Sequence, residues 1–323
     1  MEAGNQIKYL PYKEIDKEKW DACIANAPNG LIYAYSFYLD HMAKHWDALV
    51  LNDYEAVMPL TWNKKYSFYY LYQPAFTASL GVFGKNLNAG VVAHFLKSIP
   101  SKFKLIEISL NRGNIFSFPP PFLVRNNYIL HLNKPYEELY KAYRDNHKRN
   151  ITKAFQSGCS VRKDISVDEI IKLNEEQLKH ISGTKPGDYP NFKKLFDFLK
   201  SRKQAEVYGI VDPKNKMLAS AVFFYSHNRA YYIMVGNHPD ARLPVTVKTN
   251  GHEQVGQGKT IGASHALIDA FIKDHANQNL ILDFEGSDIR NLAFFYSGFG
   301  AKEEIYPALK INKLPWYVRL FKK

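Results

Sequence analysis

The stretch that decides the fold begins with Asp283-Phe284-Glu285-Gly286-Ser287 and continues to FFYSGFGA at 294–301. A largely apolar strand is predicted over 280–284, and side chains alternate between the two faces of a strand. Asp283 and Glu285 are therefore predicted to share one face at the end of this strand. Two carboxylates in such a place need partners, which are either the reacting groups of a cleft or nearby lysines and arginines.

Outward from this stretch, hydrophobic periodicity predicts the same series of elements twice. In the first half, strands and helices alternate as strand, two helices, three strands, helix and strand, over 7–10, about 20–24, 36–45, 48–51, 56–62, 68–72, 88–98 and 105–110. After a strand at 128–132 and one long helix over 136–155, the series runs again. Its elements are a strand at 159–162, helices at 167–180 and 191–201, three strands within 206–235, a helix at 264–275, a strand at 280–284 and a short helix at 291–296.

The spacing between a helix start and the following strand end is the same in both halves. Gly90 precedes Asn111 by 21 positions, and Gly262 precedes Asp283 by 21 positions. Equal spacing at corresponding places indicates an internal duplication.

The order of elements and the 283–301 motif resemble the FemAB-like proteins of the GNAT superfamily, which include the Fem-type peptidoglycan aminoacyltransferases. The resemblance implies an α/β class with a mixed sheet and two tandem GNAT-like domains. We expect these domains at 1–128 and 129–308, with a hinge at Pro119-Pro120-Pro121 and a tail, 309–323, that packs on the first domain.

The resemblance also implies the chemistry. Fem-type enzymes have a Phe-Lys pair before the Gly-containing turn, whereas this chain has Phe295-Tyr296. A tyrosine at the analogous GNAT helix protonates the departing thiolate of coenzyme A, so Tyr296 favours an acyl-CoA donor over aminoacyl-tRNA. Glu285 or Asp283 would accept the proton of an amine acceptor. The alternatives are structural ion pairs for the carboxylates and a packed ring for Tyr296.

Four further residues of the second half form the predicted cofactor-binding turn. Gly262, Ala263, Ser264 and His265 lie where GNAT enzymes receive the cofactor pyrophosphate on backbone amides at a helix start, with Ser264 as the expected N-cap. Gly258-Lys259-Thr260 is not a P-loop, because the first glycine of that motif is replaced by Glu253.

A basic segment resembles the one that precedes the second half of Fem-type proteins. On one long helix, Lys141, Arg144 and Lys148 would share a face that could hold phosphates, or else a solvated surface. The residues expected to bind substrate are Lys148, Arg149, Asn150 and Lys153 here, and Tyr72, Gln73, Asn111 and Arg112 in the first half.

Composition restricts the partners. The net charge of +12 and pI near 9.3 favour a polyanionic partner, whether a phosphate-bearing cofactor, tRNA or an anionic lipid surface. Two distant cysteines argue against a disulfide framework, and the histidines lack metal-ligand spacing, so no metal is expected. Neither a signal peptide nor a membrane-spanning helix is expected, which favours the cytoplasm. The aromatic and cationic tail would suit peripheral contact with the inner face of the membrane.

Three functions remain open from the sequence. The first is acyl transfer from acyl-CoA (acetyl-CoA) to an amine in cell-envelope metabolism. The second is aminoacyl-tRNA-dependent transfer to a peptidoglycan precursor, and the third is non-catalytic binding of an anionic lipid or precursor.

Overall fold

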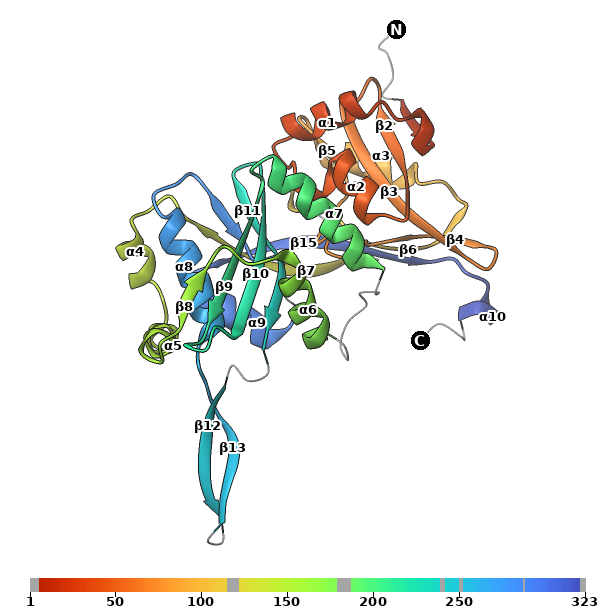
Figure 1. Ribbon diagram of the computed structural model, residues 1–323. Coiled ribbons are helices and arrows are strands. Elements are labelled where there is room, and N and C mark those ends of the chain that lie inside the picture. Colours follow the sequence, from red (N-terminus) through yellow and green to blue (C-terminus); the bar gives the residue numbers. More distant parts are fainter. Residues whose placement is uncertain are drawn as a thin grey trace. The chain divides into compact units, whose positions relative to one another are not determined.

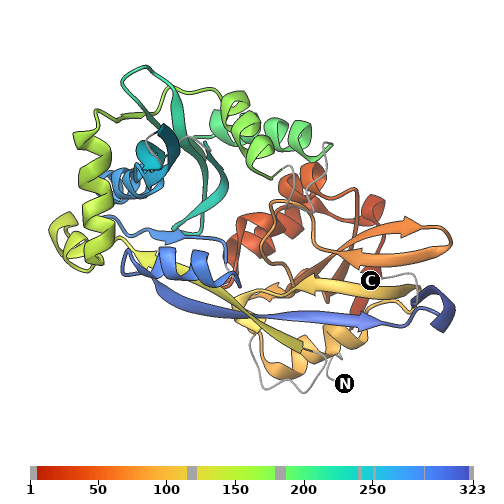
Figure 2. The same cartoon turned by 90° about the horizontal axis from the view of Figure 1, so that it is seen from below.

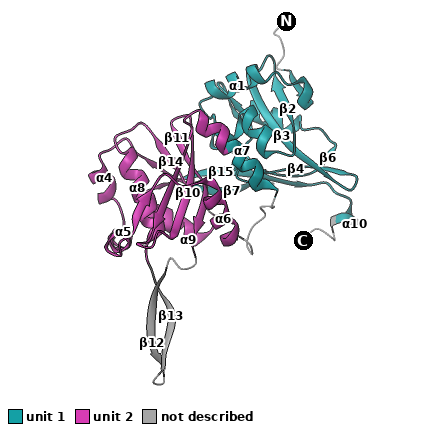
Figure 3. Cartoon of the chain, in the orientation of Figure 1, with its two compact units in different colours: residues 1–127, 186–195, 304–323 teal, residues 128–185, 196–303 magenta. Residues whose placement is uncertain are grey.

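The computed structural model describes residues 6–114, 122–178, 187–238, 242–249, 252–286 and 288–319. The predicted hinge at 119–121 lies outside these residues. The chain divides into two compact units (Figure 3): unit 1 comprises 1–127, 186–195 and 304–323, and unit 2 comprises 128–185 and 196–303.

Unit 1 is built on a sheet with the strand order β1-β2-β3-β4-β6-β15, and β5 pairs with β3 (Figure 1). Neighbouring strands are antiparallel except for the parallel pair β4 and β6. The strands are β1 (Ile7–Leu10), β2 (His45–Leu51), β3 (Ala56–Lys65), β4 (Phe68–Tyr72), β5 (Phe83–Gly84), β6 (Phe103–Ser109) and β15 (Lys302–Asn312). The helices are α1 (Lys17–Asn26), α2 (Ser36–Met42), α3 (Ala89–Lys97) and, near the C-terminus, α10 (Trp316–Arg319).

Unit 2 repeats this arrangement, with the strand order β8-β9-β10-β11-β14-β7. Only β11 and β14 are parallel. The strands are β8 (Ser160–Arg162), β9 (Ala205–Val211), β10 (Met217–Ser226), β11 (Arg229–Asn237), β14 (Ile281–Asp283) and β7 (Phe122–His131); β12 (Arg242–Thr249) and β13 (His252–Thr260) pair only with each other. The helices of this unit are α4 (Tyr136–Lys141), α5 (Asp145–Gln156), α6 (Val167–Leu178), α8 (Ala263–His275) and α9 (Arg290–Ser297), and α7 (Asp188–Ser201) is divided between the two units after Leu195.

Each unit thus has four antiparallel strands, a parallel partner that follows a helix, and a last antiparallel strand. The predicted α/β class with two tandem copies of one fold is confirmed.

Helix starts follow from local side-chain chemistry. The Asp16 carboxylate accepts hydrogen bonds from the backbone amides of Glu18 and Lys19, and Asn88 accepts one from Val91 at the start of α3. Such caps satisfy amides that have no partner inside the helix, and each typically contributes about 1 kcal/mol.

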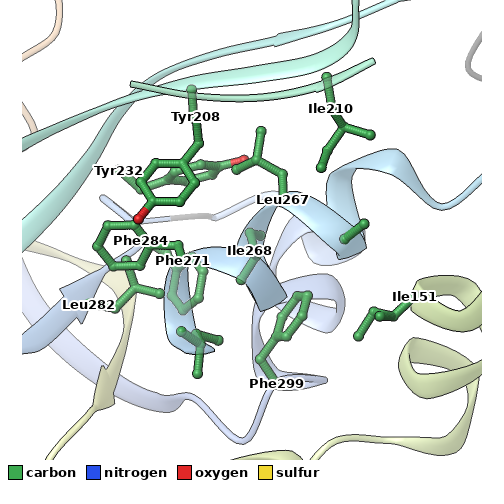
Figure 4. Packing of buried hydrophobic residues seen from close by; sticks show 14 of the residues in the cluster. Ile151, Tyr208, Ile210, Tyr232, Leu267, Ile268, Phe271, Leu282, Phe284 and Phe299 are labelled. Atoms are coloured by element: carbon green, nitrogen blue, oxygen red, sulfur yellow. The ribbon is translucent and has the colours of Figure 1, made fainter. Parts of the chain in front are cut away.

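The core of unit 2 lies between α8 and the sheet. Figure 4 shows Leu267, Ile268 and Phe271 of α8 beside sheet residues that include Tyr208. The Phe271 ring stacks on Phe223 with centroids 3.9 Å apart, and both rings are fully buried. Burial of a phenylalanine side chain stabilises the fold by about 1.5–3 kcal/mol, so this face fixes α8 on the sheet.

The core of unit 1 lies on the matching side of its sheet. Val92 and Phe95 of α3 pack against Ile106 and Ile108 of β6, and all four are buried. The inner face of each central helix therefore packs on the sheet of its own unit.

The long helix predicted over 136–155 is instead two helices. The break falls at Ala142, Tyr143 and Arg144, where Arg144 is extended (φ −64°, ψ 147°) and its backbone N–H donates to Gly298 O at 2.9 Å. The break lets the Tyr143 ring pack edge-on against Phe299, with centroids 5.2 Å apart. A tertiary contact has overridden local helix propensity here.

Strand β15 was not expected from the sequence. Its residues 308–312 pair with 105–109 of β6, so this segment, together with 187–195, joins unit 1 rather than the second predicted range of 129–308. Within the described ranges, no helix has the length and apolarity needed to cross a bilayer.

Candidate functional site

The predicted catalytic residues lie where the parallel pair of unit 2 stops. β11 and β14 pair at Arg229↔Ile281, Ala230↔Leu282 and Tyr231↔Asp283. β14 ends there, whereas β11 continues to Asn237. The residues after Asp283 therefore leave the sheet beside a strand that runs on past them.

Asp283 is held in a buried ion pair. Its Oδ2 accepts a hydrogen bond from Nη1 of Arg229 at 2.6 Å, and the two side chains are only 6% and 3% exposed. Its Oδ1 accepts a hydrogen bond from the backbone amide of Glu285 at 2.9 Å. The structural alternative for Asp283, an ion pair, is therefore what the structure contains.

Glu285 does not share a strand face with Asp283. The strand ends at Asp283, and Glu285 has a left-handed backbone with φ of +63°. A left-handed conformation is unusual for a residue other than glycine and has an energetic cost. The hydrogen bond that the Glu285 amide donates to the Asp283 carboxylate stabilises this turn.

Tyr296 lies on α9 with 8% of its surface exposed. Its ring stacks on Phe284 at 4.6 Å and meets Tyr232 edge-on at 6.4 Å. Burial, and then the nearby Glu285 carboxylate, raise the pKa of the Tyr296 hydroxyl above its usual value. The Tyr296 phenol is therefore protonated at neutral pH. No described residue hydrogen-bonds the hydroxyl, so no contact within this part of the chain competes for that proton.

The start of α8 differs from the predicted cap. Gly262 is the N-cap, with φ of +83°, and a Cβ there would lie 2.2 Å from Asn150 O. Ser264, predicted as the N-cap, lies inside the helix and donates from Oγ to Oδ1 of Asn237. The close approach of α5 leaves room only for glycine at position 262.

Two histidines meet between α5, α8 and α9. His265 lies edge-on to His147 at 4.7 Å, and Asn150 Nδ2 lies 3.2 Å from His265 Nε2. Burial, then the neighbouring His147, lowers the pKa of His265 to about 3. His265 is therefore neutral and supplies no charge to a phosphate.

The basic segment is only partly available for binding. Arg144 donates from Nη1 to Phe294 O and from Nη2 to Ser297 Oγ, both at 3.0 Å, and its guanidinium lies over the Phe294 ring. Because α4 and α5 are separate helices, Lys141 and Lys148 do not form one helical face. On α5, Arg149 is exposed, and Lys148 and Lys153 are half-buried.

The residues predicted in the first half lie in unit 1. Asn111 is fully buried and binds the carbonyls of Leu80 and Val82 and the side chain of Asn29, so it has a packing role. Gln73 binds Ser109 N and Thr77 O. The remaining two residues have surface contacts: the Tyr72 hydroxyl accepts from Lys44 N at 2.8 Å, and Arg112 pairs with Glu304 at 3.5 Å.

In unit 1, other segments hydrogen-bond the end of β6, which forms the parallel pair with β4. After β4, the chain returns so that Leu80 N donates to Ser109 O at 2.8 Å, and Leu80 bridges Leu110. The Gln73 side chain accepts from Ser109 N. These contacts occupy the backbone amide and carbonyl of Ser109, the last residue of β6.

Sequence reasoning missed Arg229, His147 and Gly298. A Cβ on Gly298 would lie 2.0 Å from Cε1 of His147, while Nε2 of His147 lies 2.8 Å from Phe295 O. The only sequence signal was the pair of glycines after Tyr296. Among the described residues, no three His, Cys, Asp or Glu side chains gather as a metal site.

Comparison with solved structures identifies the fold. FemX superposes with a TM-score of 0.60 at 13% identity, covering 98% of this chain and 100% of that one. The C-terminal domain of a putative lysylphosphatidylglycerol synthetase from Agrobacterium fabrum gives 0.52 at 10% identity, covering 95% and 94%. L-PGS from Bacillus licheniformis gives 0.50 at 11% identity, covering 99% and 97%.

The chain has the fold of FemX. No protein-family model matches the chain, and no curated protein matches its sequence. At these identities the likeness establishes the Fem-type fold, and the chemistry depends on the residues of this chain.

Proposed function

We propose that the chain is an N-acyltransferase that moves an acyl group from an acyl-CoA thioester, such as acetyl-CoA, to an amine acceptor, with the chemistry in unit 2. The observation that carries the proposal is the pair formed by Glu285 and Tyr296. A carboxylate in a fixed turn lies close enough to a buried, protonated phenol to raise its pKa.

The two groups suit the two proton transfers of the reaction. Glu285 accepts the proton that the amine nitrogen loses as it bonds to the carbonyl carbon. The carbon–sulfur bond then breaks, and the Tyr296 hydroxyl protonates the departing thiolate. Exchange with solvent restores both groups. Asp283, in its ion pair with Arg229, holds Glu285 in place and does not itself take the proton.

The start of α8 fits the phosphates of the donor through backbone groups. The positive end of a helix dipole favours an anion, and α5, the helix that contacts Gly262, carries Lys148, Arg149 and Lys153. Ala263, Ser264 and His265 would contribute their amides, because their side chains are buried, hydrogen-bonded or neutral.

The closed end of the unit 1 pair supports placing the reaction in unit 2. At the end of β6, the amide of Ser109 donates to the Gln73 side chain and its carbonyl accepts from the amide of Leu80.

The second candidate function is aminoacyl-tRNA-dependent transfer to a peptidoglycan precursor. The exposed Arg149 and the other cations of α5 favour it, since tRNA is bound through its phosphates. Tyr296 in place of lysine favours the acyl-CoA donor. Either reaction would serve the cell envelope from the cytoplasmic side of the membrane.

The test is titration calorimetry of the full chain with coenzyme A and acetyl-CoA, followed by thiol release with an amine panel. Saturable binding is expected, and Tyr296→Phe should keep that binding and release thiol about 100-fold more slowly or worse. The matched control is Tyr208→Phe, another buried tyrosine of unit 2, whose hydroxyl binds Asp274 at 3.0 Å.

No binding of either donor would reject the acyl-CoA reaction and direct the search to aminoacyl-tRNA. Binding without turnover of any amine, with Tyr296→Phe indistinguishable from wild type, would favour a non-catalytic binding protein.

A further inference from the structure

One end of the unit 1 sheet carries exposed aromatic and basic side chains that the proposed reaction does not use. We call this the tip surface and define it as Lys64, Lys65 and Tyr66 of the β3–β4 turn with Lys313 and Trp316 after β15. Figures 1 and 2 show the end of this hairpin and α10 on the same side of the unit.

Strand register explains why these distant segments meet. Lys65 pairs with Phe68 at the turn, and β4 runs parallel to β6 from Tyr69↔Phe103 onward. β15 is antiparallel to β6 and reaches Asn312↔Leu105. The β3–β4 turn, the start of β6 and the end of β15 therefore lie at the same end of the unit 1 sheet.

The aromatic residues of the tip surface are exposed at an energetic cost. Tyr66 is 86% exposed and Trp316 is 74% exposed. Tyr66 also has a left-handed backbone, with φ of +53°, which is unfavourable for a bulky residue. Packing within the chain does not compensate Tyr66, so the position points to an external contact.

An apolar pocket lies beside the tip surface. It has a volume of ≈ 380 Å³ and is enclosed by the face of β4 and β6 and by the segment after β15. Its apolar lining comes from Phe68, Tyr70, Tyr72, Leu105, Leu314 and Val318. Aliphatic and aromatic groups therefore continue inward from the exposed rings.

The charge around the pocket is positive. Lys64, Lys65 and Lys313 are exposed, and the one carboxylate in the pocket lining, Glu107, has Lys310 at 3.6 Å. Lys65 lies 5.8 Å from the Tyr66 ring centre, so charge and ring occur together at the turn.

We propose that the tip surface docks the protein on an anionic lipid bilayer. Tyr and Trp rings favour the boundary between headgroups and acyl chains, and lysines at that depth are attracted to anionic headgroups. The apolar pocket can contact the acyl chains of lipids, whereas the phosphates of a nucleic acid would make no use of an apolar surface. This inference does not depend on the proposed reaction.

The test is sedimentation of the full chain with vesicles of pure phosphatidylcholine and of phosphatidylcholine with 30 mol% (about one third) phosphatidylglycerol. Binding to the anionic vesicles is expected, with loss at high salt. Lys64→Gln with Lys65→Gln should weaken binding about 10- to 30-fold, because each lysine near the surface contributes roughly a fivefold factor in affinity. Tyr66→Ser should weaken it at every salt concentration.

The matched control is Lys214→Gln with Lys216→Gln, two exposed lysines in the β9–β10 turn without an exposed aromatic neighbour. This variant has the same net charge as the test variant and should bind like wild type. Tryptophan emission gives a second measurement, because Trp316 is exposed, whereas Trp20 and Trp46 are buried and Trp62 is half-buried. A blue shift on anionic vesicles that disappears in Trp316→Phe supports docking at this surface.

Failure to bind anionic vesicles at low salt would overturn the proposal, as would equal losses in the test and control variants. A chain that binds tRNA through Lys64 and Lys65 but leaves vesicles in the supernatant would also overturn it.

Discussion

Arg229 and Asp283 form an almost fully buried ion pair, although 54 residues separate them in the sequence. Their strands are parallel neighbours, so the pair joins the first residue of β11 to the last residue of β14. The same carboxylate fixes the backbone of Glu285. The stability of unit 2 and the position of Glu285 therefore both depend on the Asp283 carboxylate.

Removing one charge of this pair should be strongly destabilising. We expect Asp283→Asn to lower the free energy of unfolding by about 3–5 kcal/mol, because the buried Arg229 loses the charge of the carboxylate that it contacts at 2.6 Å. Urea unfolding followed by circular dichroism measures this. The control Asp164→Asn breaks the Arg162–Asp164 pair, in which Asp164 is 72% exposed, and should change little. Equal effects of the two substitutions would contradict the buried pair.

Gly298 is required by its neighbour rather than by its backbone. We expect Gly298→Ala to cost about 1–3 kcal/mol in unfolding free energy, because the new methyl group would meet His147 Cε1 at 2.0 Å. Gly187→Ala is the control, since nothing lies within 4 Å of its Cβ position. A Gly298→Ala protein as stable as the control protein would show that His147 can move aside.

The stability of the fold should fall in acid because of His265. The folded pKa of His265 is about 3, below its ordinary 6.5, so the unfolded chain binds more protons between these values. This contribution is therefore intact above pH 6.5 and is lost as pH falls towards 3. Urea unfolding at several pH values tests it. His265→Phe should flatten that dependence, whereas His94→Gln, at an exposed position on α3, should leave it unchanged.

Substitutions of Glu285 and of Glu303 should have different effects on turnover. In the proposed reaction, Glu285→Gln removes the base and should slow kcat about 100- to 10,000-fold while donor binding stays unchanged. Glu303→Gln, at an exposed position on β15, should turn over like wild type. Equal turnover by wild type and Glu285→Gln would assign the proton transfer to another group.

Elements with a strong local pattern were predictable from the sequence. The alternating aromatic run Phe68–Tyr72 is a strand with the predicted bounds, and the helix predicted at 264–275 is α8. β15 was not predictable, because KEEIYPALKIN mixes charges with an internal proline and becomes a strand through its pairing with β6.

The 283–301 motif predicted Glu285 and Tyr296 as catalytic residues, because their types and order carry the resemblance, and that role stays a prediction. The contacts inside the candidate site were not predictable. The partner of Asp283 could not be inferred, since Arg229 lies far away along the chain. Asn111 was misleading for the same reason: a polar residue after a strand gives no sign of the buried carbonyls that it binds.

The position of β15 has a consequence for synthesis of the chain. Every strand of unit 2 is complete once residue 283 has left the ribosome, whereas unit 1 lacks the partner of β6 until residue 312 has emerged. Chains generally fold from the N-terminus as they are made. In this protein, unit 1 is the first unit to be synthesised and the last to be completed. The backbone groups of β6 that pair with β15 therefore stay unpaired until late in translation. An unpaired strand edge can associate with other chains, and a chaperone would prevent this.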